Sequence, residues 1–451
     1  MTIPAGPLEQ ERAMTSHAMY RWSLIVALGG LLFGFDTAVI SGAEQAIQSQ
    51  WGLSEIKVGQ MVAMGLYGTI VGALFGGMPA ERWGRKGALI GIGILYLACS
   101  LGCALAPNAE QLMAFRFLGG LGVGASSVIA PTYISEVAPA EKRGQLAAMF
   151  QLNIVVGIVL AYLSNWLIGL ADEHSWRVML GVMAIPSALF IVLVPSIPES
   201  PRWLILHGNK VADARRILSM INPATVESSV AAIQAPTSDK AVGLSHFLSG
   251  KYRRPTALAF LIAFFNQLSG INAVIYYAPR VLEGAGLQQS AALLSTVGIG
   301  VVNVIFTVVG MALIDRMGRR FLMYIGSIGY IVSLTLVSYA LLHGITGGFV
   351  PVCLFLFIAS HAIGQGAVIW VFIAEIFPNN VRAYGTSVGC STHWIFAAAI
   401  AGLFPFANAR LGGGAIFGGF AAMMVLQLIF VWRLMPETRG ASLEALESRL
   451  T

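Results

Sequence analysis

The chain has 451 residues, of which 57% are hydrophobic and only 11% are charged. Soluble domains usually carry about a quarter charged residues, so the composition excludes an ordinary soluble protein and predicts one that lies in a bilayer. The formal net charge of +6 does not indicate nucleic-acid binding, because the Lys and Arg residues are confined to short segments between apolar runs. All four cysteines lie within apolar runs, so neither a disulfide framework nor a metal site is expected.

Apolar stretches follow one another along the chain, each near the length of about 20 residues that a helix needs to cross a bilayer. The first six lie near 20–42, 59–79, 87–106, 111–135, 145–170 and 176–194, and the second six near 256–283, 289–314, 321–343, 348–376, 383–407 and 413–434. This pattern predicts an all-α membrane protein with twelve transmembrane helices in two six-helix bundles. The expected parts are an N-terminal bundle at 1–197, a cytoplasmic helical linker at 198–255, a C-terminal bundle at 256–435 and a cytoplasmic tail at 436–451.

Three short charged motifs occur twice, and the two copies are 234 to 239 positions apart in every case. The pairs are 81–86 (ERWGRK) with 315–320 (DRMGRR), Glu136, Pro139 and Arg143 with Glu375, Pro378 and Arg382, and 198–202 (PESPR) with 436–439 (PETR). A near-constant offset across three unrelated motifs indicates a duplicated membrane bundle. Two such halves facing each other are typical of a transporter.

The basic residues are distributed unevenly between the two sides of the predicted membrane. With the N-terminus placed inside, 22 of the 27 Lys and Arg residues fall on the inner side, four fall on the outer side and Arg116 falls within a span. Cytoplasmic segments of membrane proteins carry an excess of Lys and Arg. We therefore expect a multi-pass protein of the cytoplasmic (inner) membrane with both termini in the cytoplasm.

With these motifs in hand, the chain resembles the sugar porter family of the major facilitator superfamily over essentially its whole length. The resemblance rests on Gly34-Phe35-Asp36-Thr37, 81–86, 131–139 with Arg143-Gly144, 198–202, 267–272, 315–320 and 436–440. The resemblance implies the major facilitator fold, with alternating access around a central site for a sugar or polyol. It implies no cofactor and no enzymatic activity, and no nucleophile with a base, metal cluster or phosphate loop emerges from the helices.

Two opposite charges are predicted to meet inside the membrane. Asp36 lies near the outer end of the first span and Arg116 near the outer end of the fourth, so at a rise of ~1.5 Å per residue both lie roughly 7 to 9 Å below the interface. A carboxyl group there binds or loses a proton according to whether the guanidinium is close. The resemblance implies that this pair is the proton site of a proton-coupled porter. The alternatives are a static buried ion pair and an uncoupled carrier, and a bacterial subgroup has an acid where this chain has Met183.

Several amide and aromatic side chains fall near the middle of the predicted spans, where unpartnered amides are costly. Amides both donate to and accept from sugar hydroxyls, and indole rings stack on the apolar faces of sugars. Depth in the spans makes Gln151, Gln267, Asn272, Asn303, Gln365, His393 and Trp394 candidate substrate-binding residues, and the resemblance implies Asn266 and Trp370 as well. Asn266, Gln365 and His393 depart from the family pattern, so the particular sugar stays open. Packing between helices is the alternative for each amide, and for His361 a packing or gate role is favoured over a proton relay.

The repeated charged motifs are predicted to form a cytoplasmic gate. The candidate gate residues are Glu81, Arg82, Gly84, Arg85, Glu136, Arg143, Asp315, Arg316, Gly318, Arg319, Glu375 and Arg382. Ion pairs between the two halves would hold the inner side shut and break as the halves rock. The alternative is that these charges only determine topology.

The sequence analysis therefore predicts proton-coupled symport of a hexose, pentose or polyol into the cell. The expected partners are the sugar, the proton and the lipid bilayer, without nucleic acid, and the oligomeric state stays open with a monomer among the options. An uncoupled sugar carrier is the first alternative. A sugar sensor is a weaker one, because the tail after residue 436 has only about 16 residues.

Overall fold

The computed structural model describes residues 7–139, 142–171, 175–235, 244–378 and 380–440, together with Leu446 and Leu450. The side chains of residues 7–17, Arg143 and Leu244 lie outside this description. In the described part, twelve helices are long and apolar enough to cross a membrane. The number of spans predicted from the hydrophobic runs is thereby confirmed.

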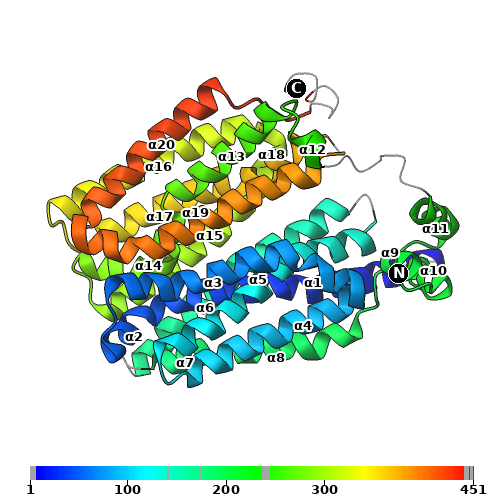
Figure 1. Cartoon of the computed structure of the whole chain (residues 1–451), viewed down its shortest axis with the longest axis horizontal. Coiled ribbons are helices and arrows are strands. Elements are labelled where there is room, and N and C mark those ends of the chain that lie inside the picture. Colours follow the sequence, from blue (N-terminus) through cyan, green and yellow to red (C-terminus); the bar gives the residue numbers. More distant parts are fainter. Residues whose placement is uncertain are drawn as a thin grey trace, which may run out of the picture.

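The N-terminal bundle supplies the first six of these spans (Figure 1). Its helices are α1 (Pro7–Val39), α3 (Glu55–Phe75), α4 (Gly77–Leu105), α5 (Ala109–Val137), α6 (Arg143–Ala171) and the pair α7 (Trp176–Gly181) and α8 (Ala184–Leu193). Between α1 and α3 lie the short turn η1 (Ile40–Gly42) and the helix α2 (Glu44–Trp51). Glycines let these helices pack closely, since a Cβ on Gly34 would lie 1.8 Å from the Ile154 carbonyl oxygen across the α1–α6 contact.

The C-terminal bundle supplies the other six spans, and two of them are interrupted. Its helices are α13 (Arg253–Leu268) with α14 (Ile271–Gly284), α15 (Gln289–Met317), α16 (Arg319–Leu342), α17 (Phe349–His361) with α18 (Ala367–Glu375), α19 (Arg382–Leu411) and α20 (Gly413–Arg433). Gly270 separates α13 from α14 with a φ of +82°, a conformation that favours glycine. A π-helical turn, η4 (Ala362–Gly366), joins α17 to α18. Interruptions of this kind are tolerated in membranes where the freed backbone lines a cavity or is buried in protein.

The segment between the bundles folds into short helices at one end of the molecule. These elements are η2 (Val194–Ser196), α9 (Pro201–Leu206), α10 (Val211–Ile221), η3 (Pro223–Thr225), α11 (Val226–Gln234) and α12 (Leu244–Phe247). Helix α1 begins and α20 ends at this same end, which we call the linker end (Figure 1). Helix α2 lies at the opposite end, which we call the α2 end.

The two bundles are closed against each other toward the α2 end. Helix α3 of the N-terminal bundle packs tightly on α19 of the C-terminal bundle, and a Cβ on Gly59 would lie 1.9 Å from the Gly402 carbonyl oxygen. Farther along the same interface the Tyr162 hydroxyl donates to the Ile275 carbonyl oxygen at 2.8 Å. This closure depends on a glycine at position 59, because any larger side chain would meet backbone that cannot move aside.

A cluster of charged and amide side chains, which we call the α2-end latch, ties the bundles together there. Arg280 of α14 donates from Nε to Glu44 at 2.9 Å, from Nη2 to Gln48 at 2.6 Å and from Nη1 to Glu55 at 3.0 Å. The Glu44 side chain is fully buried and that of Arg280 is 13% exposed. Burial raises the pKa of Glu44, although the hydrogen bond and charge of Arg280 oppose the increase.

We expect Gly59→Leu to prevent closure at the α2 end, because the new side chain would collide with the Gly402 backbone. Spin labels at Leu105 and Leu411, which are 79% and 67% exposed at that end of the two bundles, should move apart relative to the unmutated protein. Gly91→Leu is the matched control, since a Cβ at Gly91 meets no atom within 4 Å. An unchanged label distance in the folded Gly59 variant would show that this contact does not govern closure.

We expect Arg280→Gln to weaken the closed α2 end by about 3 kcal/mol at neutral pH, because it leaves the buried Glu44 carboxylate without its cation. Without Arg280 the pKa of Glu44 in the closed form rises further, so that form binds the proton more tightly than the open one. Lowering the pH should therefore restore closure. Label distances at the α2 end measured at about pH 7.5 and pH 5 test this expectation.

The control for this variant is Arg410→Gln, which removes a cation that lies over the Phe406 ring, 5.2 Å from its centroid. That change should leave closure and its pH dependence unaltered. Opening of the Arg280 variant on acidification would contradict the role assigned to Glu44.

Candidate transport site

A cavity of about 920 Å³ lies between the two bundles. It is lined by residues of α1, α3, α5 and α6 on one side and of α13, α14, α18 and α19 on the other. Leu74, near the last residue of α3, and Arg382, the first residue of α19, both line it, so it extends to the linker end. The cavity is large enough for a small ligand, and it is closed toward the α2 end by the contacts described above.

Seven of the nine residues predicted to bind substrate line this cavity. They are Gln151, Asn266, Gln267, Asn272, Trp370, His393 and Trp394. The other two are buried but are not among the lining residues. Gln365 lies in the π-helical turn η4 and bonds to neighbouring amides, while Asn303 of α15 accepts a hydrogen bond from the Thr307 hydroxyl at 3.4 Å. Counting residues from span ends gives a side chain's depth but not the direction in which it points.

The amides of α13 and α14 form a continuous hydrogen-bonded row along the cavity wall. Asn272 Nδ2 donates to Gln267 Oε1 at 2.6 Å, and Gln267 Nε2 donates to Asn266 Oδ1 at 2.8 Å. Gln267 Nε2 also lies 3.1 Å from His393 Nδ1. Gly270 makes the row possible, because its positive φ ends α13 and lets α14 begin with Asn272 facing Gln267.

Aromatic rings complete the wall on both sides of the gap between the bundles. The ring of His393 lies 4.9 Å from Trp370 and 4.8 Å from Trp394, measured between centroids. Phe33 of α1 approaches Trp394 from the other bundle at 5.9 Å. Polar amides beside apolar ring faces are the combination that a sugar requires, since its hydroxyls need hydrogen bonds and its C–H faces need apolar contact.

Two cavity residues that the sequence analysis did not single out are Thr37 and Tyr276. Thr37 follows Asp36 directly, and Tyr276 lies one helical turn beyond Asn272 on the same face of α14. That spacing of four residues is a signal from which Tyr276 could have been found. His361, which was set aside as a packing or gate residue, also lines the cavity and is hydrogen-bonded through Nδ1 to the Tyr330 hydroxyl.

Asp36 and Arg116 are both buried, with exposed fractions of 5% and 2%. They are close enough for their charges to interact, yet no ion pair between them lies within 4.0 Å among the described side chains. The thiol of Cys99 lies 3.6 Å from Asp36 Oδ1, and Arg116 Nε has no hydrogen-bond partner there. Glycines make room around the two groups, since a Cβ on Gly65 would lie 3.1 Å from Arg116 Nη2 and a Cβ on Gly119 would lie 2.4 Å from the Cys99 sulfur beside Asp36. The separation differs from the static buried ion pair that was the alternative.

The repeated charged motifs adopt the same arrangement in each bundle at the linker end. Arg85 forms two hydrogen bonds of 3.0 Å with Glu136, and Arg319 forms the corresponding bonds with Glu375 at 3.1 and 2.8 Å. Backbone N–H groups of Arg85 and Lys86 donate to Glu199, as those of Arg319 and Arg320 donate to Glu437. Each arginine is thus held by one acid of its own bundle and by a second acid that directly follows the last span of that bundle.

Each repeated motif requires a glycine for a steric reason. Gly84 and Gly318 have φ values of +81° and +89°, and a Cβ would lie 2.1 Å from Glu199 Oε2 or 2.6 Å from Glu437 Oε2. Only glycine permits both the turn and the approach of the carboxylate. The repeat seen in the sequence is therefore a repeated backbone and carboxylate contact.

The remaining predicted gate residues whose side chains are described form no bond between the bundles. Glu81, Arg82, Asp315 and Arg316 are exposed, and Arg382 donates to the Phe377 carbonyl oxygen at 3.3 Å. The side chain of Arg143 lies outside the described residues. The gate ion pairs between described residues are thus within a bundle, whereas ion pairs between bundles were expected for a shut linker end. The linker end is open in this structure, so that expectation stays a prediction.

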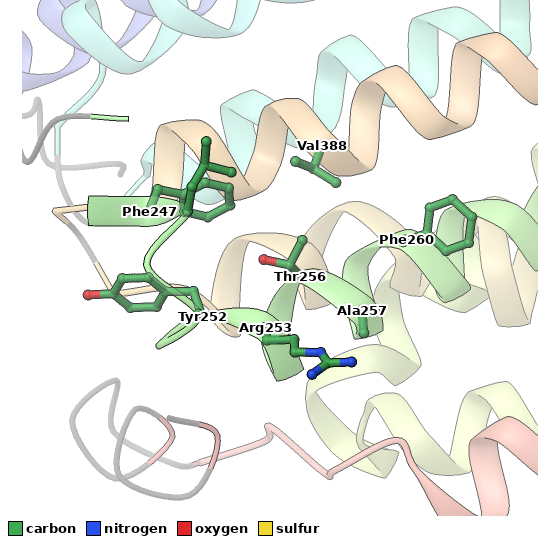
Figure 2. Close-up of a pocket in the computed structure, with 9 residues that line it drawn as sticks. Phe247, Tyr252, Arg253, Thr256, Ala257, Phe260 and Val388 are labelled. Atoms are coloured by element: carbon green, nitrogen blue, oxygen red, sulfur yellow. The ribbon is translucent and has the colours of Figure 1, made fainter. Parts of the chain in front are cut away.

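A second hollow of about 480 Å³ lies in the C-terminal bundle alone, between α12, α13 and α19 (Figure 2). Its wall is formed mainly by apolar side chains such as Phe247, Phe260 and Val388, with Thr256 and Arg253 beside them. No amide lines it, and it does not lie between the bundles. The central cavity is therefore the better candidate for a polar substrate.

Comparison with known proteins agrees with this geometry. The model of the family described as "Sugar (and other) transporter" matches residues 22–450. The chain is 36% identical to a D-xylose transporter of Levilactobacillus brevis, over 94% of both chains. It is 34% identical to an arabinose-proton symporter of Bacillus subtilis, over 94% of this chain and 93% of the relative.

Among solved structures, the fold matches an inward open conformation of the xylose transporter XylE from E. coli. The TM-score is 0.85 at 30% sequence identity, and the match covers 96% of this chain and 100% of the other. The family match, the identities and the twelve spans together show a transporter rather than an enzyme: the chain belongs to the sugar porter family of the major facilitator superfamily.

Proposed function

We propose that this protein carries a monosaccharide or polyol into the cell together with a proton, by alternating access. The observation that carries the proposal is the amide row of Asn266, Gln267 and Asn272, which lies beside aromatic rings in a cavity between the two bundles. A sugar porter needs such a site at a position where both bundles can contact the bound sugar. The xylose and arabinose carriers among its relatives support a monosaccharide cargo.

The arrangement of Asp36 and Arg116 supports proton coupling. A carboxyl group buried beside a guanidinium, without a fixed ion pair, can bind a proton in one conformation and release it in another as the distance between the two groups changes. Asp36 is adjacent in sequence to Thr37, which lines the cavity opposite Tyr276 of the other bundle. Movement of α14 against α1 as the bundles rock therefore couples the charged pair to the sugar site. The arabinose-proton symporter among the relatives supports this assignment.

We assign the linker end to the cytoplasm. The excess of Lys and Arg in segments at that end supports the assignment, as does the likeness to the inward open form of XylE. In this orientation the cavity is open to the cytoplasm and closed by the α2-end latch on the outer side. We assign the protein to a cell membrane of the bacterial type, with both termini in the cytoplasm.

Proton coupling is tested with Asp36→Asn. The variant should still exchange sugar across liposome membranes, because the cavity is intact, but it should lose sugar accumulation driven by a pH gradient. Sugar-dependent alkalinisation of the outer medium should disappear as well. Asp213→Asn, on the exposed face of the linker helix α10, is the control and should accumulate sugar normally.

Active accumulation that persists unchanged in Asp36→Asn would overturn proton coupling through this residue. Equilibration without accumulation in the unmutated protein would favour the uncoupled carrier instead. A panel of D-xylose, L-arabinose, D-glucose and myo-inositol in the same liposomes identifies the substrate class.

The sugar site is tested by comparing Asn272→Ala with Asn303→Ala. Asn272 lines the cavity and Asn303 does not, so the first change should weaken sugar binding about tenfold to a hundredfold, the range for losing hydrogen bonds to a polar ligand. The second change should leave binding within about threefold. Titration calorimetry in detergent measures both. Equal losses in the two variants would place the sugar elsewhere.

A further inference from the structure

The amide row of the cavity continues into the interior of the C-terminal bundle, away from the substrate. Asn266 Nδ2 donates to Gln365 Oε1 at 3.4 Å, and Gln365 Nε2 donates to Gln427 Oε1 of α20 at 2.8 Å. Gln427 Nε2 then donates to Ser327 Oγ of α16 at 2.8 Å. Gln365, Gln427 and Ser327 are fully buried, and none of them lines the cavity. Six polar side chains, from Asn272 to Ser327, therefore form one chain, which we call the amide relay.

Every hydrogen bond of the relay runs from donor to acceptor in the same sense, from Asn272 toward Ser327, and the bonds of Ser327 determine that sense. The Ser327 hydroxyl donates its only proton to the Met323 carbonyl oxygen at 2.7 Å. Its oxygen must therefore accept from Gln427, which in turn must present Oε1 to Gln365. The second N–H of Gln365 makes only a long contact with the Ile262 carbonyl oxygen, at 3.4 Å, so the orientation of Gln365 depends mainly on its 2.8 Å bond to Gln427. Each amide is thereby oriented by the one behind it.

The direction of the relay determines what the cavity offers to a sugar. Both N–H groups of Gln267 are used, one by Asn266 and one by a ring nitrogen of His393. Gln267 can therefore meet a ligand only as an acceptor, through Oε1. Because Gln267 is the donor, the facing ring nitrogen of His393 must be the unprotonated one, which leaves the other as the N–H.

The buried end of the relay requires an explanation beyond packing. A neutral amide inside a membrane bundle is costly unless it is bonded, and an apolar residue would fill the position of Gln427 without that cost. The π-helical turn η4 is what aims Gln365 at α20, and α16 lies tightly against this turn, since a Cβ on Gly326 would lie 2.8 Å from the Gly364 Cα. The fold thus brings three separate spans together to support one amide.

We infer that Ser327 and Gln427 are positioning residues for the sugar site, which act through the amide relay to make Gln267 an acceptor and so select a sugar with a hydroxyl donor at that point. The inference rests on the proposed sugar-binding function. Neither residue touches the sugar. Their effect is on which hydroxyl pattern is accepted, not on whether the cavity exists.

The test uses fluorine, because a C–F group has nearly the size of a hydroxyl yet cannot donate a hydrogen bond. Binding is measured for the sugar that the unmutated protein carries, D-glucose or D-xylose, and for its monofluoro analogues at each ring position. At the position facing Gln267 the unmutated protein should prefer hydroxyl over fluorine by about fivefold to tenfold. Ser327→Ala and Gln427→Met free the relay to reverse, so this preference should fall to about twofold or less.

Gln427→Glu is the matched control. A carboxyl group at this position still accepts from Gln365, so the direction of the relay and the preference at that position should be retained. The ratio of two affinities within one variant does not depend on expression level or overall stability. Ser327→Ala, which removes a single oxygen, keeps the test available if Gln427→Met fails to fold.

The outcomes separate this inference from the function on which it rests. If the unmutated protein binds no sugar, the proposed function fails. If it binds sugar and prefers hydroxyl at one position, but Ser327→Ala and Gln427→Met keep that preference in full, the relay does not position the site. An equal loss of affinity for every analogue would likewise overturn the inference, because it would indicate a packing role only.

Discussion

The structure depends on one constraint: inside a bilayer, a polar side chain must find its partner within the protein or face a water-filled cavity. The amides of the C-terminal bundle satisfy this constraint by bonding to one another in a row that reaches the cavity at Asn272 and Gln267. The carboxyl group of Asp36 satisfies it less completely, with a thiol at 3.6 Å and an arginine nearby. A ligand or a proton that binds where polar groups lack partners would form hydrogen bonds that the protein itself does not supply.

The two duplicated bundles share the same arrangement of backbone and charged residues at the linker end, but the polar side chains in their interiors differ. At the linker end each bundle repeats the same contact, an arginine held by a partly buried acid and by a carboxylate that accepts from two backbone N–H groups. The N-terminal bundle carries the charged pair of Asp36 and Arg116, whereas the C-terminal bundle carries the amide row and the spans interrupted at Gly270 and at η4. Under the proposed function, rocking of the two halves would move the proposed proton site relative to the proposed sugar site, which is what coupling requires.

Much of the fold could be read from the sequence, because hydrophobic length and charge bias act locally. The twelve spans follow from run length, and seven of the nine predicted substrate-binding residues line the cavity. What could not be read was direction around the helix axis. Gln365 points away from the cavity because a π-helical turn rotates that part of the span, and a single extra residue in a turn leaves no hydrophobic signature.

The relations between the bundles were equally hidden from the sequence. Arg280 was assigned no role in the sequence analysis, yet it bonds to Glu44, Gln48 and Glu55 across the interface. The charges of the repeated motifs, expected to pair between halves, pair within them while the linker end is open. Which charged residues pair depends on the conformational state. The same sequence adopts every state of the transport cycle, so it does not show which pairs form in any one of them.

The most direct measurement of the central claim is the ratio of protons to sugar molecules taken up by liposomes that contain the unmutated protein. Radiolabelled sugar and an internal pH dye would report the two fluxes in the same vesicles. The proposed function, with Asp36 and Arg116 as the proton site beside the cavity, predicts one proton for each sugar and accumulation above equilibrium while a pH gradient lasts. Sugar that equilibrates with no accompanying proton flux would contradict the account.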